Sequence, residues 1–156
     1  ITINKNRYII NGLELLLDGK DNEGTGKHNS NATVWKDLSG KNRDGTLMNM
    51  DIGNSWSEEG LNFDGIDDYV PIAEMNYDNV TVENVVSLKE IDNEHNVIMG
   101  NNQVGGYEIY SEINSRKIGF WVYVKEKNGF EFTIRRQGNG VIEKNIVFLV
   151  HMMVIV

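Results

Sequence analysis

Apolar and polar side chains alternate with a period of two along several short segments of the chain, and this pattern is typical of half-buried β-strands. In the segment 117–125, KIGFWVYVK, one face is apolar, formed by Ile118, Phe120, Val122 and Val124. Trp121 and Tyr123 fall on the opposite face of this segment. The segment 80–89, VTVENVVSLK, alternates in the same way. Both segments are predicted to be strands with one face in a core.

Further strand-like segments recur between clusters of Gly, Asn and Asp. They are RYII, LELLL, GLNF, DYVPI, NVIMG, GYEIYSEI and FEFTIRR. No stretch keeps apolar residues at helical spacing for three turns. Short strands without helices can hide their apolar faces only by stacking two sheets or closing a barrel. The sequence therefore predicts a single all-β domain over residues 1–156, built as an antiparallel two-sheet sandwich.

Charge and composition exclude several functional classes. The 156 residues contain no cysteine and carry a formal net charge of −8. The lack of cysteine excludes disulfides, thiolate metal sites and a cysteine nucleophile. Nucleic-acid binding depends on clustered Lys and Arg, so the acidic balance argues against DNA and RNA as partners. The three histidines are scattered and no Gly-x-Ser-x-Gly motif occurs, so neither zinc nor acyl-transfer chemistry is supported.

Three aspartates gather in the segment 60–72, GLNFDGIDDYVPI, at Asp64, Asp67 and Asp68. Carboxylates this close in sequence repel one another unless water, a cation or backbone N–H groups relieve them. The segment is therefore either a calcium loop, with these three residues as candidate ligands, or a tight turn.

The order of several segments resembles a known family. These segments are GLELLLDG, WKDLSGKNRDGTL, GLNFDGIDDYV, TVENVVSLKE, GGYEIY and KIGFWVYV. They are similar to the laminin-G-like jelly roll of the concanavalin A-like lectin and glucanase superfamily, in its bacterial and phage form, over roughly residues 8–135. The most specific parts are the segment 35–47, with an Asp-x-Ser-Gly step at 37–40, and the block 63–70.

The resemblance implies a jelly-roll sandwich and a glycan or cell-surface polysaccharide as partner, at an extracellular, cell-surface or virion location. In the block 63–70 it implies a strand, a turn at Gly65 and a second strand, with Asp64 and Asp67 accepting local backbone N–H bonds. We therefore expect a non-catalytic carbohydrate-binding or adhesion module. The rival classes are a glycosidase-like enzyme and a purely structural domain without ligand.

The tail, residues 141–156, departs from the family pattern, which continues with a Thr-Tyr-Asp-Gly turn. Its end, IVFLVHMMVIV, is shorter than the roughly 20 residues that a membrane-spanning helix needs, so no membrane insertion is expected. In the alternative reading frame, the codons of the last six residues can spell the missing turn. The tail is thus either a frameshifted or prematurely ended reading of a longer domain, which would leave the sandwich incomplete, or a buried terminal strand.

Glu108, Tyr110 and Glu112 share one face of the predicted strand 106–113. Their pattern is loosely similar to the Glu-x-Asp-x-Glu strand of the superfamily's glucanases, but Tyr110 occupies the position of the Asp. Four strand residues span roughly 13 Å, which is wider than the about 5 to 9.5 Å that separates glycosidase carboxylates. We therefore expect no enzyme activity.

The same strand face is the candidate ligand site. Sugar sites join an exposed aromatic ring to nearby carboxylate or amide groups. The candidate residues are Trp121, Tyr123, Tyr110, Glu108 and Glu112, provided that the two strands are neighbours. The alternative is that these rings belong to the core. Trp35 and Trp56 are expected in core or loop packing.

Overall fold

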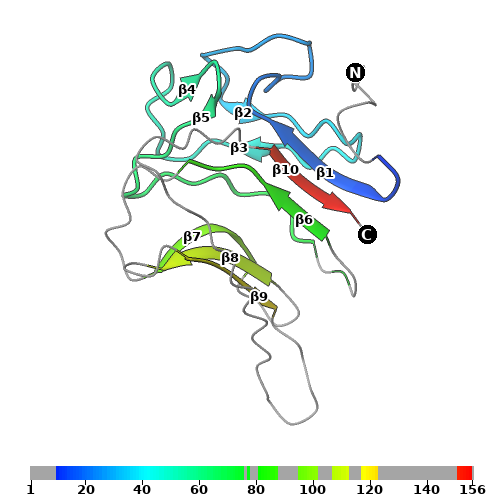
Figure 1. The fold of residues 1–156 in the computed structure, drawn as a ribbon. Helices are drawn as coiled ribbons and strands as arrows, with labels where there is room; N and C mark the ends of the chain where they lie inside the picture. Colours follow the sequence, from blue (N-terminus) through cyan, green and yellow to red (C-terminus); the bar gives the residue numbers. More distant parts are fainter. Residues whose placement is uncertain are drawn as a thin grey trace. The chain divides into compact units, whose positions relative to one another are not determined.

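The computed structural model describes residues 10–75, 77, 81–87, 95–101, 107–112, 117–122 and 151–155 (Figure 1). Every regular element in these residues is a β-strand, and every strand pairing is antiparallel. The described residues include no helix of the length and hydrophobicity that a membrane span requires. The all-β prediction is confirmed for this part of the chain. The strands form four small sheets.

The contacts divide the chain into two compact units, which are described separately. The first comprises residues 1–73, 79–86 and 148–156, and the second comprises residues 74–78 and 87–147. The single-domain organisation over 1–156 stays a prediction.

The largest sheet of the first unit joins segments from both ends of the chain. It contains β1 (Leu13–Asp18), β10 (His151–Ile155) and β6 (Thr81–Asn84), in the order β1-β10-β6. Figure 1 shows β10 between its two neighbours. Residues 151–155 of the tail form a strand, whereas most of the tail lies outside the described residues, so the interpretation of 141–156 as a buried terminal strand stays a prediction. The frameshift interpretation concerns the coding DNA and stays a prediction.

Strand β1 is buried along nearly its whole length, because Leu13, Leu15, Leu16 and Leu17 are all in the core. A continuous apolar run of this kind suits a strand that is covered on both faces. The segment after β2 runs beside β1, where the Leu38 N–H donates to the Leu16 carbonyl over 2.8 Å.

Two ladders of two residues per strand complete the first unit. They pair β2 (Val34–Trp35) with β3 (Gly45–Thr46) and β4 (Trp56–Ser57) with β5 (Gly60–Leu61). Trp35 and Trp56 are buried and meet edge to face, with ring centroids 5.4 Å apart. Their expected place in the core is confirmed. The predicted strand GLNF is reduced to β5, and DYVPI contributes only an isolated bridge between Tyr69 and Met48.

The second unit contains the sheet β7 (His95–Gly100), β8 (Tyr107–Glu112) and β9 (Lys117–Val122), in that order. The predicted neighbourhood of β8 and β9 is confirmed, with Glu108 opposite Trp121 and Glu112 opposite Lys117. The predicted strand FEFTIRR lies outside the described residues, as does most of RYII.

Candidate functional site

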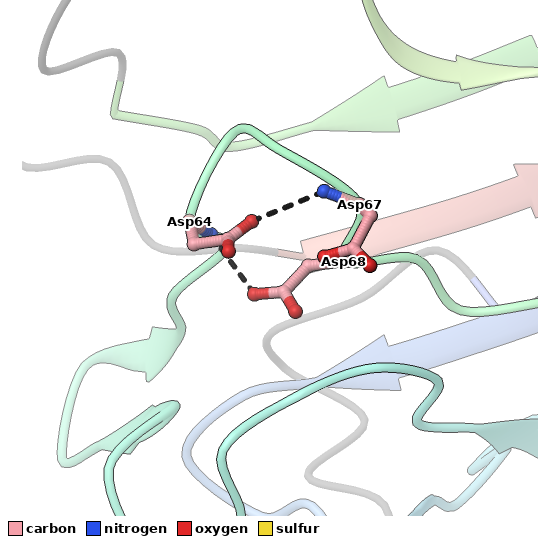
Figure 2. Close-up of side chains that lie close together, drawn as sticks. All are labelled: Asp64, Asp67 and Asp68. Carbon is pink, nitrogen blue, oxygen red and sulfur yellow. Dashed lines mark hydrogen bonds between the residues drawn. The ribbon is translucent and has the colours of Figure 1, made fainter.

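The block 63–70 forms a tight, exposed turn closed by its own aspartates (Figure 2). The Asp64 carboxylate accepts the backbone N–H of Ile66 over 2.8 Å and that of Asp67 over 3.4 Å. The Asp68 carboxylate accepts the N–H of Asp64 over 2.9 Å. Gly65 adopts φ of 80°, a backbone angle that residues with a Cβ resist.

The turn predicted at Gly65 is therefore confirmed, together with the role of Asp64 as an acceptor of local N–H bonds. The second acceptor was assigned wrongly. The Asp68 carboxylate closes the turn, whereas the backbone carbonyl of Asp67 accepts the side-chain amide of Asn49 over 2.9 Å. The sequence shows which residues can close an Asx-type turn, but the choice between Asp67 and Asp68 depends on the path of the backbone.

The turn concentrates negative charge at one place on the surface. The three carboxylates each offer an oxygen within 4.8 Å of the others. The backbone N–H of Ile66 is the main cause that lowers the pKa of Asp64 below 3.8, and further backbone N–H groups act in the same direction. In the described residues, the ion pairs join Lys36 to Asp44 and both Lys41 and Arg43 to Glu14, so the basic side chains in these pairs are held by other carboxylates.

Both ends of the turn are fastened to the same neighbouring segment of the first unit. Before the turn, the Asn62 N–H donates to the Ser55 carbonyl over 2.7 Å. After it, Tyr69 and Met48 exchange two backbone hydrogen bonds of 3.0 and 3.3 Å. These bonds join backbone atoms only, so they fix both ends of the turn without using the side chains of Phe63 and Tyr69.

Large apolar side chains on this turn are exposed. Phe63 is 48%, Ile66 is 86% and Tyr69 is 50% accessible to solvent. The sequence prediction had placed Phe63 and Tyr69 in the strands GLNF and DYVPI, and so it missed them as surface groups. The available signal was their position: each is next to one of the three turn aspartates, where little strand can form.

The spacing of the carboxylates is compatible with a calcium ion. Calcium takes 6 to 8 oxygens at about 2.3 to 2.6 Å, so two of its ligands lie no more than about 5 Å apart. The three aspartates meet that distance, and carbonyls or water would have to supply the remaining ligands. The backbone N–H bonds to Asp64 and Asp68 already account for the geometry of the turn without an ion.

The strand face predicted as a ligand site is less exposed to solvent than expected. Glu108 and Tyr110 are each only 1% accessible to solvent, so the prediction that they point outward is wrong. The strand period of two gave the shared face of these residues, but it cannot say which face a neighbouring layer covers. Trp121 and Glu112 lie in described strands opposite Glu108 and Lys117, and Tyr123 lies outside the described residues.

In the other segment of the resemblance, 35–47, the side chain of Asp37 is the centre of a hydrogen-bond network. The buried Asp37 carboxylate accepts the N–H groups of Leu16, Ser39 and Arg43 over 2.9 to 3.0 Å, and the Ser39 hydroxyl over 2.8 Å. Gly40 follows with φ of 87°. The Asp-x-Ser-Gly step thus fastens this segment to β1.

A comparison of the chain with protein-family models, with curated proteins and with solved structures found no match.

Proposed function

We propose that the chain is a non-catalytic carbohydrate-binding or adhesion module of a bacterial surface or phage particle, and that its ligand surface is the turn 63–69. The resemblance of the segments 35–47 and 63–70 to laminin-G-like jelly rolls supplies the fold and the location in this proposal. One observation carries the ligand surface: Phe63 and Tyr69 are exposed beside three carboxylates on a turn fixed at both ends.

The chemistry of sugars explains why this combination supports the proposal. A sugar ring has an apolar C–H face, which packs on an aromatic ring, and a rim of hydroxyls, which donate to carboxylates. Ordering a flexible loop costs free energy on binding, and a turn already held by the Asn62 and Tyr69 backbone bonds avoids most of that cost. The ligand in this proposal is a glycan or cell-surface polysaccharide.

The strand face is the weaker alternative because Glu108 and Tyr110 are buried. A general acid or base must lie within hydrogen-bond reach of the bond that it acts on. The burial of Glu108 therefore also weighs against the glycosidase-like alternative, in which Glu108 and Glu112 flank a sugar bond.

The proposal is tested by titrating oligosaccharides from bacterial surface polysaccharides and following binding by calorimetry. We expect Phe63→Ala and Tyr69→Ala each to weaken binding about tenfold or more, which corresponds to about 1.4 kcal/mol. Ile52→Ala is the matched control, because Ile52 is an exposed apolar residue outside the turn. Binding that survives both turn substitutions but is lost in Trp121→Ala would move the site to the strand face. A lack of binding to every glycan would overturn the proposal.

The same titration, run with calcium and with a chelator, defines the role of the aspartates. We propose that calcium bridges the turn and the sugar. Binding should then be tighter with calcium than with the chelator, and Asp67→Asn should remove this difference in affinity. Asp67 is suited to the test because its carboxylate is not one of the two that close the turn. Equal affinity under both conditions would leave the carboxylates as direct acceptors of sugar hydroxyls.

A further inference from the structure

Asn49 lies outside the turn 63–69 but contacts it through its side chain. The Asn49 amide donates to the backbone carbonyl of Asp67 over 2.9 Å, across 18 positions of sequence. In the described residues, the other side-chain hydrogen bonds of the turn come from Asp64 and Asp68, which belong to the turn itself (Figure 2). Within this part of the chain, Asn49 is therefore the one side chain that fastens the middle of the turn to the rest of the first unit.

The backbone at Asn49 explains how its side chain reaches the turn. Met48 and Tyr69 form an isolated antiparallel bridge, so Asn49 comes next to the residues that precede Tyr69. Asn49 has φ of 63°, in the left-handed region, which asparagine adopts more readily than most residues with a Cβ. This angle interrupts the extended backbone, so the pairing ends after one bridge. The side-chain amide then supplies the next bond to the turn.

This bond fixes the backbone of Asp67 and leaves its side chain to a ligand. The carboxylates of Asp64 and Asp68 accept the N–H groups that close the turn. Asp67 instead accepts through its carbonyl, and its exposed carboxylate has an oxygen within 4.8 Å of the other two carboxylates. Asp67 is therefore the aspartate of the turn that is best able to bind a ligand, and Asn49 determines where it lies.

We propose that Asn49 is a positioning residue, which holds Asp67 where its carboxylate meets the ligand. This inference rests on the proposed function, in which the turn 63–69 is the ligand surface. Asn49 acts through Asp67 and does not itself bind the ligand. A segment that is fixed before binding loses less conformational entropy when the ligand arrives. Because the bond lies on the exposed surface, its loss should weaken binding without lowering the stability of the whole fold.

Asn49→Gly tests this role, because it deletes the amide and keeps the backbone angle, which glycine adopts without strain. Asn42→Gly is the matched control. Asn42 is exposed, has φ of 59° and makes no described side-chain bond to the turn, so its replacement adds the same backbone freedom elsewhere. Both variants are compared with the unchanged chain by urea unfolding, by hydrogen exchange of the Ile66 and Asp67 N–H groups, and by the glycan titration.

We expect Asn49→Gly to speed the exchange of these N–H groups severalfold and to weaken glycan binding severalfold, with a urea midpoint equal to that of Asn42→Gly. In the Asp67→Asn background, Asn49→Gly should weaken binding little further, because both residues act on the same contact. Unchanged exchange, or a full further loss of affinity in the Asp67→Asn background, would overturn the positioning role. Faster exchange in a chain that binds no glycan would overturn the proposed function and keep Asn49 as the anchor of Asp67.

Discussion

At the scale of single residues, two aspartates illustrate opposite uses of the same side chain. Asp37 is buried and satisfies donors from β1 and from its own turn, so its role is to hold two segments together. Asp64 is exposed and satisfies only its own turn. Both were predictable as turn-forming residues from their neighbours Ser39, Gly40 and Gly65. That Asp37 also reaches the Leu16 N–H, 21 positions away, depended on the tertiary structure.

Replacing Asp37 by Ala should therefore be among the most damaging single changes in the first unit. It leaves the buried N–H of Leu16 and the part-buried N–H of Arg43 without their acceptor, and an orphaned buried donor costs about 1 to 3 kcal/mol. We expect a loss of about 3 kcal/mol in the free energy of unfolding, measured by urea titration. Ser39→Ala removes only the hydroxyl bonds and should cost about 1 kcal/mol. Equal losses in the two variants would contradict the assigned role of Asp37.

At the scale of elements, the first unit depends on close approaches that involve glycine. A Cβ on Gly19, just after β1, would come within 2.6 Å of the Gly60 Cα in β5. A Cβ on Gly45 in β3 would instead collide with the Val70 side chain. The sequence shows both glycines only as turn or strand-end residues. Whether an added Cβ would meet backbone atoms or a side chain depends on which segments pack together.

These two glycines should respond differently to the same substitution. Gly19→Ala forces two backbones apart, and overpacking of this kind costs about 1 to 3 kcal/mol. Gly45→Ala should lose a similar or smaller amount, and Val70→Ala in the same chain should restore part of it by removing the colliding methyl group. Val70→Ala should give no such recovery with Gly19→Ala. Thermal and urea unfolding of the three single variants and the two double variants measure these couplings, and recovery in both backgrounds would contradict the two contacts.

At the scale of the whole molecule, the chain is acidic, and folding stabilises the ionised form of two of its carboxylates, those of Asp44 and Asp64. Burial raises the pKa of Asp44, but the Lys36 hydrogen bond, the Asp37 N–H and the charge of Lys36 bring it below 3.8. The pKa of Asp64 is lowered mainly by the Ile66 N–H. The folded state therefore binds fewer protons than the unfolded state at these two groups.

Because the pKa values of Asp44 and Asp64 are lowered in the folded state, the stability of the fold depends on pH in the acid range. A carboxylate whose folded pKa lies below its unfolded value stabilises the fold above the unfolded pKa, and this contribution is lost as the pH falls through the folded pKa. We expect the urea midpoint to fall as the pH drops below about 4, the unfolded value of Asp. Asp64→Asn and Asp44→Asn should each flatten this acid limb, whereas Asp51→Asn, which changes an exposed aspartate, serves as the control. An acid limb that stays unchanged in both variants would show that these two carboxylates do not cause the loss of stability.

The local pattern of side chains was enough to predict that the chain forms strands and to predict where several turns lie. The period of two in segments such as 117–125 and 107–112 requires extended backbone if one face is to be buried. The Gly and Asp residues at 64–68 favour a turn. The neighbourhood of β8 and β9 followed as well, because a short connection between two alternating strands favours a hairpin.

The tertiary structure alone decided which strands are partners and which side chains reach solvent. Nothing in the local pattern of β1 identifies β10 as its neighbour, because pairing between the two ends of a chain is a property of the whole fold. In the same way, Tyr110 is buried and Phe63 is exposed, although both are aromatic residues in or beside strand-like segments. Burial depends on what packs against a face, and periodicity carries information only about which residues share that face.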